Sequence, residues 1–281
     1  MSRSVKARRA LAASLALVLT GFGVTTVLAP ALADTRSNGP QVVGGQAGPE
    51  AAFKRVGTVR RTAVTTAAAT AATTAVARTA TVSTSYTFST LLDGQPVRWD
   101  PCTPIRWTAN TARGPAGGLE VLQEAVNRVA QATGTTWQYV GASSATATSS
   151  YLPKSTQASY PPVLLGWTDG ASSDLLAGQA KSVLGMTRTA WFGIQRPDGS
   201  KVAATRAAVI ALDRTDTLPL RGATSWKALA LHELGHVMGL GHVGDRTQLM
   251  ATVLPPVTDL QAGDQAGLTR VGRTAGCVVV R

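Results

Sequence analysis

HELGHVMGLGH, residues 232–242, contains every histidine of the 281-residue chain. His232 and His236 are four residues apart, so on a helix they project from one face, because four residues turn the helix by about 400°. Two imidazoles placed in this way can both bind one ion at about 2.0–2.1 Å, the usual Zn–N distance. The spacing therefore predicts a helix whose two histidines share a metal ion.

The residues between and after these histidines predict a catalytic site. Glu233 is rotated by about 100° from His232, where its carboxylate can contact a water on the ion and act as a general base. Gly239 can adopt a positive φ and end the helix, so that His242 returns to the ion as the third ligand. Three protein ligands leave a coordination position open, which favours a catalytic metal over a structural one. A purely structural metal site is the alternative.

The composition and the hydrophobic periodicity of the chain beyond residue 85 predict one folded domain. All six tryptophans lie there. Periodicity and turn signals predict a mixed sheet of about five strands with a sheet-packing helix, an active-site helix and a C-terminal helix, an α+β domain. The predicted strands are 104–110, 136–141, 162–167, 189–195 and 201–213; the predicted helices are 119–132, one from about 225, and 259–271.

The first 85 residues differ from the predicted domain in composition. Residues 1–33 combine a basic start, an apolar run and the small-x-small site Ala31-Leu32-Ala33, which together predict a signal peptide. A retained membrane anchor is the alternative. Residues 34–85 form an Ala/Thr-rich segment that we expect to lack a core and to serve as a linker or pro-segment. The folded domain with the histidine motif is then 86–281, and the protein is expected outside the cell or in the cell envelope.

The charge of the chain lies mostly outside the predicted domain. Residues 86–281 hold 17 Lys and Arg against 13 Asp and Glu, although the whole chain carries a formal charge of +12. The basic residues of the domain are spread out, so we expect no nucleic-acid partner. No stretch after the signal peptide is long and apolar enough to span a bilayer. We expect a monomer.

Two cysteines, Cys102 and Cys277, lie near the two ends of the predicted domain. In an exported chain such a pair predicts one disulfide, which would tie the first strand region to the C-terminus. The alternative is a free Cys102 that binds the metal and inhibits the enzyme.

The long motif HExxHxxGxxH resembles the signature of the metzincin zinc metallopeptidases. Met250, in TQLMATVL, stands where that clan has the methionine of its Met-turn; an ordinary core methionine is the alternative. The short spacing from His242 to Met250 is most similar to the matrixins and their bacterial relatives. The resemblance implies a zincin-like fold over 86–281.

The resemblance also implies which segments line the substrate-binding cleft. TAWFGIQ, 189–195, would be an antiparallel edge strand that binds an extended peptide substrate, with AAVIALD as its neighbour. Leu254-Pro255-Pro256 would wall the specificity pocket. Val243 follows the third histidine where matrixins usually have serine. Thr252 stands where astacin-like members have a tyrosine ligand.

Two further expectations concern cofactors and inhibition. Zn²⁺ is the expected catalytic ion, and calcium has candidate ligands whose spacing matches no calcium loop: Asp169, Asp174, Asp213 and Asp216. Matrixin pro-segments block the zinc with a cysteine in a Pro-Arg-Cys-Gly context. Cys102 lies in WDPCTPIRW instead, which favours the disulfide.

These observations predict a secreted zinc endopeptidase with Glu233 as general base and with a protein or peptide substrate. Two other functions remain open from the sequence. One is a non-catalytic envelope or adhesion module that keeps the zinc helix for stability. The other is a zinc hydrolase that acts on cell-wall peptides.

Overall fold

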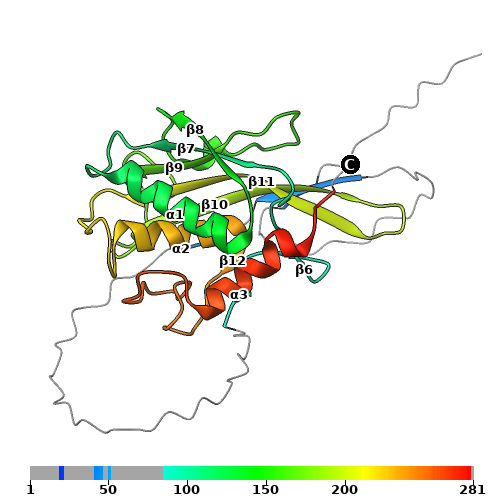
Figure 1. The fold of residues 1–281 in the computed structure, drawn as a ribbon. Helices are drawn as coiled ribbons and strands as arrows, with labels where there is room; N and C mark the ends of the chain where they lie inside the picture. Colours follow the sequence, from blue (N-terminus) through cyan, green and yellow to red (C-terminus); the bar gives the residue numbers. More distant parts are fainter. Residues whose placement is uncertain (1–18, 22–40, 47–49, 52–84, 280–281) are drawn as a thin grey trace, which may run out of the picture.

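The computed structural model describes residues 19–21, 41–46, 50–51 and 85–279 (Figure 1). Five strands from residue 105 onward form the body of a mixed sheet in the order β10-β11-β9-β7-β8. Neighbouring strands are parallel except β10 and β11, which form an antiparallel pair. The five strands are β7 (Ile105–Asn110), β8 (Trp137–Ala142), β9 (Val163–Thr168), β10 (Gly185–Gln195) and β11 (Lys201–Asp213). The predicted α+β fold with about five strands is confirmed for this part of the chain.

Burial along the strands follows their place in the sheet. All six residues of β9 are buried, because this central strand is covered on both faces, as parallel strands usually are. In β8, at the end of the sheet, half-buried and exposed residues alternate, because successive side chains point to opposite faces.

The described residues form three α-helices, which lie together on one side of the sheet (Figure 1). They are α1 (Gly118–Thr133), α2 (Trp226–Met238) and α3 (Ala262–Val271). Helix α1 buries Val121, Leu122, Val126 and Val129, the i, i+4 pattern of one face, and ends at Gly134 with φ 66°. Helix α2 is buried on nearly all sides, between the sheet and the other helices.

Smaller elements complete the domain. β4 (Thr87–Phe88) pairs with β12 (Leu240–Gly241), immediately after helix α2, and β5 (Leu91–Leu92) pairs with β6 (Gln95–Pro96). Two short 3-10 helices span Ser149–Tyr151 and Arg273–Ala275. The β4–β12 pair fixes the chain between the second and third histidines of the motif.

Strand β10 corrects the expectation of a free edge. Its antiparallel pairing with β11 was expected, but β2 (Gln41–Gln46) and β3 (Glu50–Ala51) pair antiparallel with its other side. β1 (Leu19–Gly21) in turn pairs with β2, which brings the sheet to eight strands. Residues 34–85 were expected to lack a core and to serve as a linker or pro-segment, and the structure shows that two of their segments, β2 and β3, are strands of the sheet. A strand can add to an edge through backbone hydrogen bonds alone, so the poor apolar content of this segment did not exclude it.

Other predictions for the N-terminal region are not decided by the fold. The predicted signal peptide lies outside the described residues except for Leu19–Gly21, and the Ala/Thr-rich part of the linker lies outside them almost entirely. Within the described part of the chain, no helix combines the length and the apolar character that crossing a bilayer requires.

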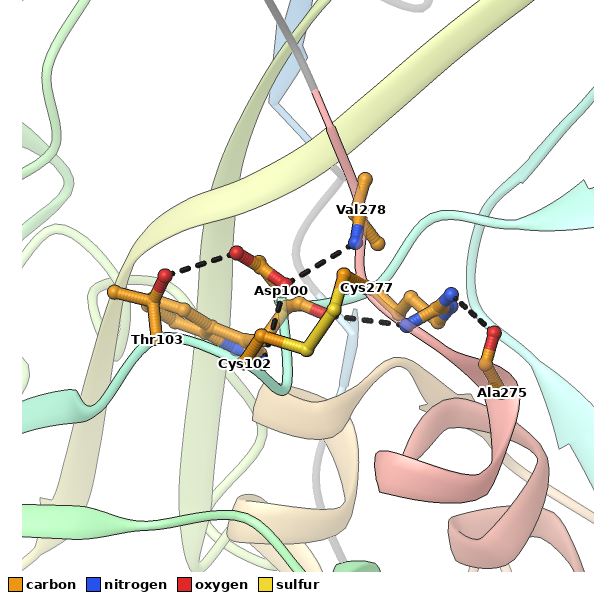
Figure 2. Close-up of a disulfide and its surroundings, with 8 residues drawn as sticks. Asp100, Cys102, Thr103, Ala275, Cys277 and Val278 are labelled. Carbon is orange, nitrogen blue, oxygen red and sulfur yellow. Dashed lines mark hydrogen bonds between the residues drawn. A yellow bond between two sulfur atoms is a disulfide. The ribbon is translucent and has the colours of Figure 1, made fainter.

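A disulfide joins Cys102, before β7, to Cys277 near the end of the chain (Figure 2). The Asp100 carboxylate accepts hydrogen bonds from the backbone N–H groups of Cys102 and Val278, both at 3.1 Å, and so spans the same two segments. Burial acts to raise the pKa of Asp100, but these hydrogen bonds and one from Thr103 outweigh it and leave the pKa below its ordinary value. The two ends of the domain are thus held together both covalently and by a charged acceptor.

Candidate metal and catalytic site

Helix α2 carries the first two histidines, and its two ends are well defined. Ser225 is the N-cap, and its hydroxyl accepts a hydrogen bond from the N–H of Ala228 at 3.2 Å. At the other end Gly239 has φ 103°, and its N–H donates to the carbonyls of Gly235 and His236. The helix ends where the motif predicted, and the chain turns back through β12 toward His242.

The three histidines converge on one point. Their Nε2 atoms lie 3.0 Å apart for His232 and His236, 3.1 Å for His232 and His242, and 3.2 Å for His236 and His242. One tetrahedral ion with bonds of about 2.0–2.1 Å holds its ligand nitrogens about 3.3 Å apart. The spacing of these three nitrogens therefore fits a single zinc ion.

The opposite ring nitrogens fix the tautomers of two of these histidines. His232 Nδ1 donates to the carbonyl of Leu249, and His236 Nδ1 donates to the carbonyl of Leu240, both at 2.8 Å. An imidazole that donates from Nδ1 and is neutral presents the lone pair of Nε2, which is the form that binds a metal. Burial lowers the pKa of His232 well below its usual value, and the nearby rings of His236 and His242 lower it further. The site thus favours neutral, metal-binding imidazoles.

Glu233 follows His232 on α2 and is fully buried, at the interface of α2 with strand β10. The hydroxyl of Thr187, on β10, donates to its Oε2 at 2.6 Å. Gly185, two residues earlier on the same strand, has no side chain to displace the carboxylate: a β-carbon there would lie 2.9 Å from Oε1. Strand β10 therefore holds the carboxylate of Glu233 in a defined position.

Met250 packs against helix α2 at Gly235. It is buried, and Gly235 is so close that a β-carbon added there would collide with the Met250 sulfur. Its carbonyl accepts from the N–H of Val243 at 2.9 Å, so the loop that follows the third histidine closes on itself. The glycine inside the helix is thus explained by the close approach of this methionine.

Asp264 holds this loop in place, and sequence reasoning missed it. Its buried carboxylate accepts hydrogen bonds from the N–H groups of Leu249 at 2.8 Å and Met250 at 3.1 Å. It also accepts from the N–H of Gln261 at 2.7 Å, in a capping box at the start of α3. Burial raises the pKa of Asp264, although the three N–H donors act against this. The only local signal was the spacing of three residues from Gln261 to Asp264.

A second carboxylate shapes the turn between His242 and Met250. Asp245 accepts hydrogen bonds from the hydroxyl and the N–H of Thr247 at 2.7 Å and 2.9 Å. The Thr247 hydroxyl and N–H, with smaller contributions from Ser85 and Gln248, lower the pKa of Asp245 to about 2. The turn therefore has its acceptor ionised throughout the neutral range.

The acids considered for calcium have other contacts in the described structure. Asp169 pairs with Arg214 at 2.6 Å and Arg113 at 3.3 Å, and its pKa is lowered by hydrogen bonds from Ser172 and Arg214. Asp174 accepts from the N–H of Ser149 at 2.8 Å. The Asp213 carboxylate accepts a hydrogen bond from the hydroxyl of Thr215 at 2.8 Å. These contacts do not bring the four carboxylates together at one point.

The segment expected to wall the specificity pocket was Leu254-Pro255-Pro256. Leu254 and Pro255 are buried in the structure.

Comparison with known proteins agrees with the metzincin-like fold and with the group of three histidines. The matrixin family model matches residues 123–271, and the chain belongs to the matrixin family. Matrixins are zinc-dependent metalloendopeptidases. No curated protein matches the chain.

Among solved structures, the chain is similar to metalloproteinase-II from Bacteroides fragilis, with 17% sequence identity and a TM-score of 0.34. That similarity covers 64% of this chain and 57% of the other. The chain thus spans little more than half the length of that structure.

Proposed function

We propose that this protein is a secreted zinc-dependent endopeptidase in which Glu233 is the general base. The observation that supports the proposal most is the convergence of three histidine Nε2 atoms, 3.0–3.2 Å apart, beside a buried carboxylate. His232, His236 and His242 would hold the ion. Zinc, when bound, polarises the scissile carbonyl and makes an attacking water more acidic.

The remaining chemistry belongs to residues of the chain. Glu233 would take the proton of the attacking water and then deliver it to the leaving amine. Met250 would support the imidazoles from below. Strand β10 would bind an extended substrate through backbone hydrogen bonds, because it passes next to Glu233 and its outer side can pair with an added strand, as β2 does.

Removal of the metal is expected to abolish cleavage. Purified chains of residues 34–281 and 86–281 would be incubated with a diverse peptide mixture, and the products identified by mass spectrometry. A chelator should stop cleavage, and stoichiometric zinc should restore it, because the three histidines are the proposed ligands. Folded, zinc-loaded protein that cleaves no peptide would contradict the proposal and favour a cell-wall peptide hydrolase or a binding module.

The proposal of secretion rests on the sequence and on the disulfide. Residues 1–33 would direct export and be removed before Asp34. The Cys102–Cys277 disulfide supports an oxidising compartment, where such bonds form and persist.

Residues 34–85 would be an inhibitory pro-segment rather than a simple linker. Two of their segments, β2 and β3, pair antiparallel with β10, the strand proposed to bind substrate. β3 pairs with Met186 and Thr187, and Thr187 contacts Glu233. A chain segment in this position competes with substrate for the same backbone groups.

Weakening the β2 pairing is expected to increase turnover. In Val42→Pro/Val43→Pro two neighbouring N–H groups are lost, and because neighbours in a strand point to opposite sides, one of them faces β10. The chain of residues 34–281 should then cleave peptides several-fold faster, with an unchanged melting temperature. Ala67→Pro/Ala68→Pro, in the Ala/Thr-rich stretch, is the matched control. Equal rates for the wild type and both variants would identify residues 34–85 as a linker.

A further inference from the structure

The catalytic carboxylate proposed above is contacted from the sheet as well as from its own helix. Helix α2 fixes the backbone of Glu233, but a glutamate side chain has three rotatable bonds beyond it. Strand β10 supplies the contacts that restrict them, through Thr187 and Gly185.

Thr187 has one hydroxyl hydrogen and two acceptors within reach. Its Oγ1 lies 2.6 Å from Glu233 Oε2 and 3.3 Å from the Glu233 backbone carbonyl. The shorter contact is to the carboxylate, and hydrogen bonds to ionised acceptors are the stronger ones. Thr187 is buried, so no bulk water competes for this hydrogen bond.

Gly185 acts on the other carboxylate oxygen. Side chains two residues apart on a strand share a face, so position 185 faces Glu233 as Thr187 does. A β-carbon there would lie 2.9 Å from Oε1 and 3.3 Å from the carbonyl of Ala211, too close for the carboxylate to stay in place. Thr187 therefore holds one oxygen while Gly185 leaves room for the other.

We propose that Thr187 is a positioning residue for Glu233: its hydroxyl holds Oε2 so that Oε1 is presented for proton transfer. The inference rests on the proposed function. The hydrogen bond survives the transfer, because when Oε1 takes the proton Oε2 becomes the carbonyl oxygen and still accepts from Thr187. It also couples the base directly to the strand proposed to bind substrate.

Thr187→Val and Thr187→Ser separate positioning from packing. Valine keeps the shape and loses the donor, whereas serine keeps the donor. Kinetics would be measured on zinc-loaded chains of residues 34–281, in the wild-type and Val42→Pro/Val43→Pro backgrounds. We expect Thr187→Val to lower kcat roughly ten- to a hundredfold with little change in KM, as loss of a hydrogen bond to a charged group implies. Thr187→Ser should restore most of kcat.

The matched control is Thr205→Val, which removes a buried hydroxyl from the neighbouring strand β11 and should leave kcat unchanged. Zinc content should be equal in all variants. An unchanged kcat in Thr187→Val, a loss confined to KM, or an equal loss in Thr187→Ser would overturn the inference while leaving the proposed function intact. No turnover with Thr187 intact in either background would overturn both.

A measurement without activity tests the same contact. Denaturant midpoints would be compared for metal-free wild type, Thr187→Val, Glu233→Ala and the double variant. Thr187→Val should lower the midpoint in the Glu233 background and change it little in the Glu233→Ala background, because its partner is then absent. Additive shifts would show that the contact does not hold the carboxylate and would refute the inference.

Discussion

Glu233→Ala is expected to lower kcat/KM about a thousandfold or more while the protein keeps its zinc and its fold. General acid–base catalysis contributes roughly 10²–10⁴ to enzymatic rates, and among the described residues the group formed by His232, His236 and His242 includes no carboxylate that could replace Glu233. The ligands should be unaffected, because the Nδ1 atoms of His232 and His236 are fixed by backbone carbonyls and not by Glu233. Peptide cleavage, zinc content and melting temperature would be measured together.

Two companion variants sharpen this experiment. Glu233→Gln keeps the shape of the side chain and can still accept from Thr187, but it cannot take a proton, so it should be as inactive as the alanine variant. Glu124→Ala removes a surface carboxylate that pairs with Arg221 and Lys227, and it should cleave normally. Substantial activity in Glu233→Gln would mean that Glu233 is not the base.

Loss of the disulfide is expected to give the largest change in stability. Cys102 and Cys277 are 175 residues apart, and the chain-entropy model assigns about 5 kcal/mol to the closure of so long a loop. Measured losses for native disulfides are roughly 2–5 kcal/mol, which corresponds to a decrease in Tm of about 4–20 °C for a domain of this size. Cys102→Ser/Cys277→Ser would be compared with the wild type by calorimetry.

The disulfide-free variant should still cleave peptides at low temperature, because the hydrogen bonds of the three histidines do not involve either cysteine. Asp100 keeps its bond to the N–H of Val278 and retains part of the link between the two ends. Reduced wild type is the matched control and should melt together with the variant. A melting temperature within about 2 °C of the oxidised wild type would contradict the prediction.

The strands and helices of the domain could be predicted because each carries a local pattern. Strand β11 (Lys201–Asp213) was predicted with its exact bounds from the turn before it and its long apolar run. Strand β10 begins four residues before its predicted start, because Gly185–Arg188 has no apolar alternation. β2 and β3 were missed, since their pairing depends on backbone groups of a distant strand and on no side-chain pattern of their own.

The same distinction applies to the site. The histidines, Glu233 and Met250 could be proposed from the sequence because their expected roles depend on a spacing of a few residues, and the structure brings the three histidines together. Thr187 and Asp264 were missed because their contacts cross 46 residues to Glu233 and 15 residues to Leu249, and only the fold brings them together. The residue types did not predict these contacts, since an isolated threonine or aspartate is common on any surface.

The position of Asp264 in the sequence also affects when the site can form during synthesis of the chain. The acceptor for the N–H groups of Leu249 and Met250 lies on α3, and the second cysteine follows it near the end of the chain. Synthesis proceeds from the N-terminus, so the histidines emerge before the residues that support them. We therefore expect that a nascent chain cannot complete its metal centre until Asp264 on α3 has also emerged and folded against the loop before it.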